Sequence, residues 1–215
     1  MFELIVFDLD GTLIDSRADL ASAVNALIEE LGGRPLPVQA VTGMVGEGAG
    51  VLVRRALRAT SLDTVPAGAL ERFLQLYDDR LLDCTRPYDG ITDTLERIAS
   101  RGLAMGVLTN KPAGATERVL AGLDLRRHFT QVIGGDTPFG RKPDPGGLLQ
   151  LVRAAGATPS TTLLVGDSRI DLNTARRAGT RICLARYGFG YRFEDGDFDG
   201  TELFIDAPGE LLERL

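Results

Sequence analysis

Two aspartates separated by one residue are the feature of this 215-residue chain that most clearly points to chemistry. Asp8 and Asp10 follow Leu4-Ile5-Val6-Phe7, an apolar run that predicts a buried parallel strand. In an open α/β sheet, ligands bind at the carboxyl ends of the strands. Two carboxylates buried at such an edge are costly unless a cation lies beside them. The pair therefore predicts a cation site, and the alternative is a strand end followed by an Asp-Gly turn.

Both lysines of the chain stand in turn-like segments that follow apolar runs. Only two of the 24 Lys and Arg residues are lysine. Lys111 follows Thr109 and Asn110, and Lys142 lies in a segment with two prolines. An ammonium is a compact charge with three donors, which suits a phosphate oxygen. Composition explains why lysine is scarce, but it does not explain why both lysines share this setting.

A further acid stands at the end of a third apolar run. Asp167 follows the run 163–165, and Asp171 comes four residues later. If a helix begins near Ser168, Asp171 lies in its first turn and points back toward Asp167. Asp167 and Asp8 would then form a site for a hard cation that waters complete. Taken alone, Asp171 is typical of an acid that stabilises a helix dipole.

Together these segments resemble the haloacid dehalogenase superfamily of phosphotransferases, in the family's order and over nearly the whole chain. The motifs that carry the resemblance are Asp8-Leu9-Asp10-Gly11-Thr12, Thr109-Asn110, Lys142, and Gly166-Asp167-Ser168 with Asp171. Four further segments look like the phosphoglycolate phosphatase branch of that superfamily: Thr109-Asn110-Lys111-Pro112, Pro87-Tyr88-Asp89-Gly90, Val45–Ala49 and Ala185–Gly190.

The resemblance implies a role for each motif residue. Asp8 would attack phosphorus and become an aspartyl-phosphate. Asp10 would protonate the leaving alcohol and later deprotonate the water that hydrolyses this intermediate. Three residues would hold the phosphoryl oxygens: Thr109, Asn110 and Lys142.

The resemblance also implies a magnesium site. The carboxylates of Asp8 and Asp167 and the backbone carbonyl of Asp10 would bind Mg²⁺, and Asp171 would orient these ligands. Phosphoryl transfer requires an in-line nucleophile and charge neutralisation on three equatorial oxygens. A carboxylate that attacks a dianion needs positive charge between the two, which Mg²⁺ and Lys142 would supply.

Several rival functions remain open or are disfavoured. A pyrophosphatase, a sugar or nucleotide monophosphatase and a sugar phosphomutase of the same superfamily stay open. A dehalogenase is disfavoured because halide leaves without the proton that Asp10 would give. A phosphonatase is disfavoured because residues 15–85 contain no lysine for a Schiff base. A receiver-like signalling module needs neither Asp10 nor a lid.

The expected substrate is a small phosphorylated metabolite. Five arginines of the segment 15–85 are candidates to bind a carboxylate of that substrate: Arg17, Arg34, Arg54, Arg55 and Arg58.

Composition argues against two classes of partner. A formal net charge of −6 disfavours a nucleic-acid surface. No apolar run approaches the ~18 residues of a membrane helix, and Met1-Phe2-Glu3 lacks the basic start of a secretory signal. Two cysteines, Cys84 and Cys183, are typical of a reduced protein. We therefore expect a cytoplasmic monomer or homodimer.

The apolar runs alternate with helical patterns, which predicts an α/β fold with a doubly wound parallel, Rossmann-like sheet. The expected strands are Leu4–Leu9, Leu103–Leu108, Gln131–Gly134, Thr162–Gly166, Arg181–Ala185 and Leu203–Ile205. A last helix is expected after Pro208.

The first two strands are about ninety residues apart, where one crossover helix would be enough. Helical periodicity fills this interval. We therefore predict a helical cap domain at 15–85, inserted into a core formed by 1–14 and 86–215. Hinges are expected near Ile14–Ser16 and Asp83–Pro87, since a phosphorylated aspartate must admit substrate and exclude bulk water.

Local signals refine the interpretation of the cap. Leu20, Val24, Leu27 and Ile28 belong to one apolar stripe. Ser16 is the candidate N-cap of that helix, and Gly32-Gly33 would end it. The glycine-rich segment Gly43–Gly50 is expected to be a cap turn that faces the substrate.

Overall fold

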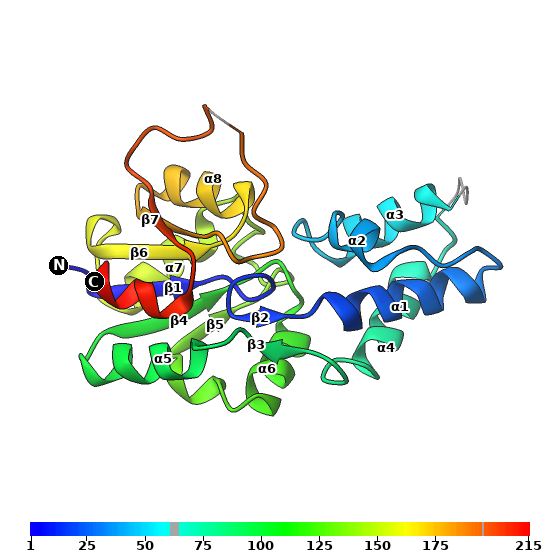
Figure 1. Ribbon diagram of the computed structural model, residues 1–215, viewed down its shortest axis with the longest axis horizontal. Helices are drawn as coiled ribbons and strands as arrows, with labels where there is room; N and C mark the ends of the chain where they lie inside the picture. Colours follow the sequence, from blue (N-terminus) through cyan, green and yellow to red (C-terminus); the bar gives the residue numbers. More distant parts are fainter. Residues whose placement is uncertain (61–64, 195) are drawn as a thin grey trace.

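The computed structural model describes residues 1–60, 65–194 and 196–215. It contains a six-stranded sheet with helices on both faces and, beside it, a separate group of four helices (Figure 1).

The six-stranded sheet is entirely parallel and has the order β5-β4-β1-β6-β7-β8. Its strands are β1 (Leu4–Phe7), β4 (Ala104–Leu108), β5 (Gln131–Ile133), β6 (Thr162–Gly166), β7 (Arg181–Ala185) and β8 (Leu203–Ile205). This arrangement confirms the predicted doubly wound α/β sheet. It also places β1 between β4 and β6, so the residues that follow these three strands meet at one edge.

The predicted strand that begins at Leu4 is two residues too long. β1 ends at Phe7, because the chain turns immediately after Asp8. The amides of Thr12 and Leu13 both donate to the carbonyl of Leu9, which closes the turn. Gly11 has φ +92°, a left-handed conformation that favours glycine.

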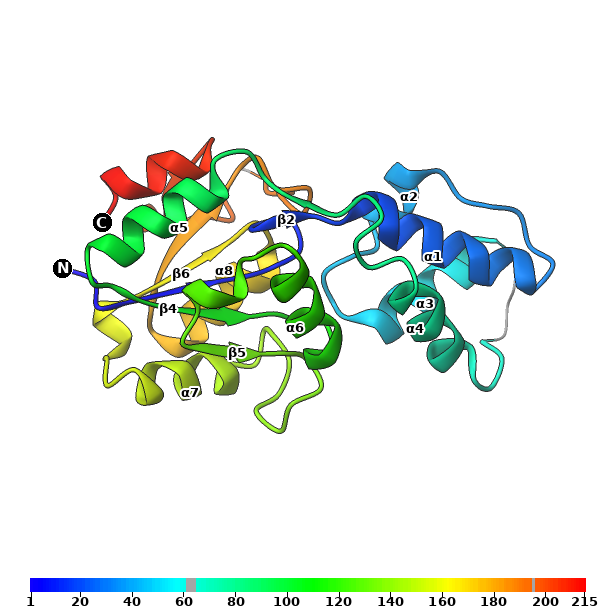
Figure 2. The ribbon, with the colours of Figure 1, turned by 90° about the horizontal axis from the view of Figure 1, so that it is seen from below.

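Side chains of alternate strand residues enter two hydrophobic clusters, one on each face of the sheet. Ile5 and Phe7 belong to one cluster, and Leu4 and Val6 to the other. The first cluster includes side chains of α5 (Ile91–Ser100), α6 (Ala113–Gly122) and the 3-10 helix η3 (Pro208–Glu213). The second includes side chains of α7 (Gly146–Ala154) and α8 (Arg169–Ala178). Figure 2 shows α5 and the C-terminal 3-10 helix on one side of the sheet and α7 on the other.

The connections after α6 and α7 contain two short 3-10 helices, η1 (Arg126–His128) and η2 (Pro159–Thr161). The helix expected after Pro208 is also a 3-10 helix. This segment has six residues, and it buries Leu211 and Leu212, which are adjacent in the sequence. A short 3-10 helix is enough to bury these two side chains.

The four helices beside the sheet are α1 (Arg17–Glu30), α2 (Val38–Thr42), α3 (Ala49–Ala59) and α4 (Ala69–Asp78). The first of them, α1, packs against each of the other three. Its stripe of Leu20, Val24, Leu27 and Ile28 is buried, as the periodicity predicted. After Glu30 the chain leaves the helix through Gly32, which has φ +79°. All four helices lie within the segment 15–85, whose boundaries as a domain stay a prediction.

Two short strands connect this helical group to the sheet. β2 (Ile14–Asp15) and β3 (Arg86–Pro87) pair antiparallel, in the segments where the hinges were expected. Next to this ribbon, the buried carboxylate of Asp19 accepts hydrogen bonds from the amides of Cys84 and Thr85 and from the Thr85 hydroxyl. These hydrogen bonds connect α1 to the segment that leads from the helical group back to the sheet.

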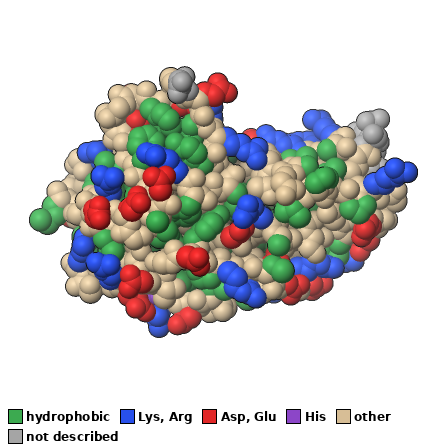
Figure 3. All heavy atoms as spheres, in the orientation of Figure 1, with side chains coloured by type: hydrophobic (Ala, Val, Ile, Leu, Met, Phe, Trp, Pro, Cys, Tyr) green, Lys and Arg blue, Asp and Glu red, His purple; other side chains and the backbone are tan. Residues whose placement is uncertain are grey.

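The surface and the helix lengths bear on the expected partners. On the face shown in Figure 3, acidic and basic side chains are interspersed over both parts of the molecule. Among the described residues, no helix combines the length and the apolarity that crossing a membrane requires.

Candidate active site

Asp8 stands at the carboxyl end of β1, in contact with a buried lysine. The Lys142 ammonium lies 2.7 Å from Asp8 Oδ1 and 2.6 Å from Asp171 Oδ1. Burial raises the pKa of Asp8 to about 7, against the opposing effect of Lys142 and with a further contribution from Asp171. Burial alone would lower the pKa of Lys142, but Asp171 and Asp8 raise it above its ordinary value. The lysine is therefore held as a cation beside the predicted nucleophile.

Asp171 lies in the first turn of α8, as expected, and completes its N-terminal cap. Ser168 is the N-cap residue, and its amide and hydroxyl both donate to Asp171 Oδ2, at 3.1 and 2.6 Å. The other oxygen, Oδ1, accepts from Lys142 at 2.6 Å. Asp171 thereby fixes the position of the Lys142 ammonium.

Asp167 follows β6 and is enclosed by backbone. The Gly190 amide donates to Asp167 Oδ2 at 2.7 Å, and the Thr12 hydroxyl lies 3.4 Å from Oδ1. A Cβ atom on Gly11 or on Gly188 would lie 2.1 or 2.2 Å from atoms of Asp167. Burial, followed by the charges of Asp171 and Asp8, raises the pKa of Asp167 well above its ordinary value.

The acids at this edge of the sheet fit a divalent cation. Asp8, Asp167 and Asp171 each offer an oxygen, and these oxygens lie within 4.8 Å of one another. Lys142 pairs with Asp8 and Asp171, and Asp167 makes no ion pair with it. Burial first, and neighbouring carboxylates second among the effects that raise them, hold the pKa values of Asp8 and Asp167 above their ordinary range. Carboxylate oxygens are the ligands that Mg²⁺ prefers, and two positive charges would offset the negative charge of these acids.

Asp10 faces the helical group. It has one hydrogen-bond partner there, Ser16, and one in the core, Lys111. Its Oδ1 accepts from the Ser16 hydroxyl at 2.6 Å and from the Lys111 ammonium at 3.1 Å. Ser16 does occupy the N-cap position of α1, but its side chain does not cap the helix. The predicted N-cap position is therefore confirmed, although the Ser16 hydroxyl binds the carboxylate of Asp10 and not a backbone amide of the helix.

The loop after β4 places two predicted phosphate ligands at the same edge. Thr109 and Asn110 are both buried. The Asn110 side-chain amide donates to the carbonyls of Gly46 and Lys142, at 2.9 and 3.0 Å. Asn110 thus links the core to the helical group. The roles predicted for Thr109, Asn110 and Lys142 toward a phosphoryl group stay predictions.

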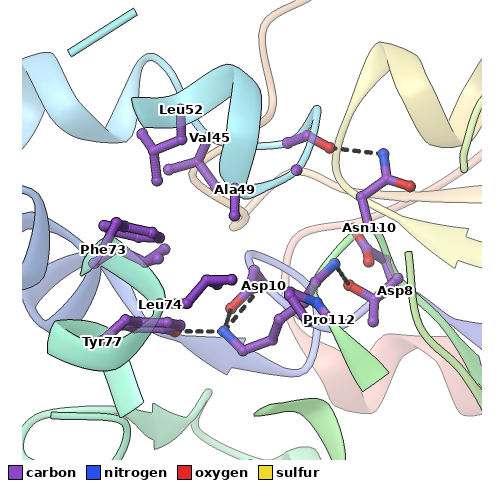
Figure 4. Close-up of a pocket in the computed structure, with 15 residues that line it drawn as sticks. Asp8, Asp10, Val45, Ala49, Leu52, Phe73, Leu74, Tyr77, Asn110 and Pro112 are labelled. Carbon is purple, nitrogen blue, oxygen red and sulfur yellow. Dashed lines mark hydrogen bonds and ion pairs between the residues drawn. The ribbon is translucent and has the colours of Figure 1, made fainter. Parts of the chain in front are cut away.

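A pocket opens between the sheet edge and the helical group (Figure 4). Its core side contains Asp8, Asp10 and the loop 109–112. Its other side is lined by α1, α3, α4 and the preceding glycine-rich segment, through Leu20, Val45, Gly46, Gly48, Ala49, Leu52, Phe73, Leu74 and Tyr77. The segment Gly43–Gly50 therefore faces the pocket, as expected.

The five arginines proposed from the sequence do not line this pocket. Arg17 pairs with Asp15 and Arg55 pairs with Glu47, and Arg34, Arg54 and Arg58 are exposed. The structure therefore does not place any of these five arginines where it could bind a substrate in this pocket.

The sequence interpretation did not find the contact of Lys111 with Tyr77, which is 34 residues away in the chain. Only the position of Lys111 after a strand pointed to it.

Comparisons with known proteins identify the family of this chain. Residues 5–185 match the model of the haloacid dehalogenase-like hydrolase family. A phosphoglycolate phosphatase of Pseudomonas putida is 42% identical over 217 residues, which span 99% of this chain and 76% of the relative. The phosphoglycolate phosphatase of Rhodospirillum rubrum is 41% identical over 196 residues, covering 88% of this chain and 81% of its own length.

A solved structure described as a predicted phosphoglycolate phosphatase from Haemophilus somnus superposes with a TM-score of 0.91 at 28% identity, covering 99% of this chain and 97% of that one. The chain belongs to the haloacid dehalogenase-like hydrolase family.

Proposed function

We propose that this protein is a Mg²⁺-dependent phosphatase that hydrolyses a small phosphomonoester through an aspartyl-phosphate on Asp8, and that phosphoglycolate is the first substrate to test. The observation that carries the proposal is the meeting of Asp8, Lys142 and Asp167 at one edge of the sheet, beside a pocket that also contains Asp10. The identity of 40–42% to phosphoglycolate phosphatases over nearly the full chain supports the choice of substrate.

Two carboxylates divide the chemistry. Asp8 attacks phosphorus, the bond from phosphorus to the alcohol oxygen breaks, and Asp10 gives a proton to that oxygen. In the second step Asp10 takes a proton from water, water oxygen attacks the phosphorus of phospho-Asp8, and phosphate leaves. Both aspartates line the pocket, and each lies against a different lysine, Asp8 against Lys142 and Asp10 against Lys111.

Positive charge must lie between the attacking carboxylate and the phosphate dianion. Lys142 provides one such charge at 2.7 Å from Asp8 Oδ1. Asp8, Asp167 and the backbone carbonyl of Asp10 would hold Mg²⁺, which supplies charge neutralisation on the phosphoryl oxygens when bound. Thr109 and Asn110 would complete the phosphate site from the loop after β4.

We further propose that residues 15–85 act as a cap that closes the site. The Asn110–Gly46 and Lys111–Tyr77 hydrogen bonds connect the core to this segment across the pocket. A closed cap excludes bulk water from the reacting phosphate. The β2–β3 ribbon would then serve as the hinge.

The test is phosphate release from a panel of phosphorylated metabolites, with Mg²⁺ and with a chelator. The panel contains 2-phosphoglycolate, pyrophosphate, sugar phosphates and nucleoside monophosphates. The proposal predicts Mg²⁺-dependent release with 2-phosphoglycolate as the preferred substrate. Equal rates on all compounds would indicate a phosphatase without substrate preference. Preference for pyrophosphate would indicate a pyrophosphatase. No phosphate release from any compound would refute the proposal.

A further inference from the structure

On the side of the helical group, the Tyr77 hydroxyl lines the pocket, and its hydrogen has no acceptor among the described residues. The Lys111 ammonium lies 3.1 and 3.3 Å from the two oxygens of Asp10 and also donates to Tyr77 Oη. Because an ammonium can only donate, Tyr77 Oη is the acceptor in that bond. The hydrogen of the Tyr77 hydroxyl therefore stays free to bind another group.

The Tyr77 hydroxyl keeps the hydrogen that this description requires. Burial raises the pKa of Tyr77 to about 12, so the hydroxyl retains its hydrogen at neutral pH. Lys111 Nζ also lies 4.5 Å from the centre of the Tyr77 ring.

On the side of the helical group, the described residues that line the pocket include no Lys or Arg. Apart from Tyr77 and two glycines, the side chains there are apolar: Leu20, Val45, Ala49, Leu52, Phe73 and Leu74. Lys111 is the only Lys or Arg among the described residues that line the pocket. Figure 4 shows Phe73, Leu74 and Tyr77 together on one wall of the pocket.

The position of this pair relative to Asp10 limits the substrate. Asp10 is the group that would protonate the leaving oxygen, and Lys111 touches it directly. A second acceptor that is to reach Tyr77 and Lys111 must therefore lie close to the leaving oxygen. A carboxylate one carbon away has two acceptor oxygens and a negative charge, whereas a sugar would place several hydroxyls against apolar walls without partners.

We propose that Tyr77 and Lys111 select the substrate by binding a carboxylate on a short leaving group, with the Tyr77 hydroxyl as donor and Lys111 as counter-charge. This inference rests on the proposed phosphatase function and assigns its specificity to two residues that take no part in the proposed proton and phosphoryl transfers.

The experiment compares Tyr77→Phe with the wild type on two substrates of similar size, 2-phosphoglycolate and 2-hydroxyethyl phosphate. Phenylalanine keeps the stacking of this ring on Phe73, at 5.8 Å between centres and 10° between planes. Tyr191→Phe is the matched control, because Tyr191 belongs to a separate aromatic group with Phe193 and does not line the pocket.

We expect Tyr77→Phe to lower kcat/KM for 2-phosphoglycolate about tenfold or more, mainly through KM, because a hydrogen bond to a charged group is lost. The fall in kcat/KM for 2-hydroxyethyl phosphate should be several times smaller, and the inhibition constant of inorganic phosphate should stay within twofold. Lys111→Met should reduce the preference for 2-phosphoglycolate in the same direction.

The outcomes separate the inference from the proposed function. An equal fall on both substrates, or no fall on either, would overturn the assignment of the carboxylate to Tyr77 while the phosphatase stands. The assignment would also be overturned if the wild-type enzyme hydrolysed 2-hydroxyethyl phosphate and 2-phosphoglycolate with equal kcat/KM. A wild-type protein that hydrolyses neither would refute both proposals.

Discussion

Gly188→Ala is predicted to weaken Mg²⁺ binding although it replaces none of the predicted ligands. An added Cβ would stand 2.2 Å from Asp167 Cβ, 2.4 Å from Asp167 Oδ2 and 2.4 Å from the carbonyl oxygen of Gly11. Two of these three atoms cannot move aside by a simple side-chain rotation. Either the loop that carries Gly188 or Asp167 itself must therefore shift.

Overpacking of this kind costs about 1–3 kcal/mol, and the backbone obstacle places this site at the upper end. In a chain of this size, 1 kcal/mol changes Tm by about 2–4 °C, so the variant should unfold about 6–12 °C below the wild type. A shift of the loop also removes the Gly190 amide from Asp167 Oδ2, which is 2.7 Å away in the structure. Mg²⁺ should then bind more weakly.

The assay is thermal unfolding with and without Mg²⁺. At about 100 times its Kd, Mg²⁺ bound only to the folded state adds about 2.7 kcal/mol, which the wild type should show as a rise in Tm. Gly188→Ala should lose most of that rise. Gly209→Ala is the control, since nothing lies within 4 Å of its added Cβ. A Gly188→Ala protein with the Tm and the Mg²⁺ response of the wild type would refute the argument that this glycine positions Asp167.

Two further predictions concern the charges at this edge. Because the pKa of Asp8 is raised from 3.8 to about 7 in the folded chain without metal, ionisation favours the unfolded state, and stability should fall as pH rises from about 4 to about 7. Mg²⁺ should therefore raise Tm more at pH 8 than at pH 5, and Asp8→Asn should flatten the metal-free slope; an unchanged slope would contradict this. Lys142→Met leaves Asp8 and Asp171 buried without their ammonium, so the unfolding free energy should drop by about 3–5 kcal/mol and phosphatase activity should be lost. Denaturant unfolding measures the first effect, and a drop below 1 kcal/mol would contradict the buried ion pairs.

The sequence predicted those parts of the molecule that local patterns determine. Buried parallel strands appear as uninterrupted apolar runs, and polar residues directly after such runs must lie at the carboxyl edge. Asp171 was predictable in the same way, since Ser168 and Asp171 form a capping box over three residues. Strand ends were less certain, because the turn at Gly11 shortens β1.

Contacts between distant segments were not predictable. Ser16 is a residue type that commonly caps helices. In the folded chain, however, its hydroxyl lies 2.6 Å from Asp10 Oδ1 and donates its hydrogen bond to that carboxylate. The contact of Lys111 with Tyr77 depends on how α4 packs over the sheet edge, which no local pattern encodes. The glycine at 188 is explained by the closeness of Asp167 and of the Gly11 carbonyl, both far away in the sequence.

The most direct test of the account is single-turnover phosphate release by the wild type and by Asp8→Asn, with 2-phosphoglycolate and Mg²⁺. Asparagine keeps the size of the side chain but removes the charged nucleophile at the end of β1. We predict that the wild-type protein transiently carries an acid-stable phosphoryl group from the substrate. Asp8→Asn should carry no such group and should release no phosphate. Phosphate release by Asp8→Asn at the wild-type rate would contradict the assignment of Asp8 as the nucleophile.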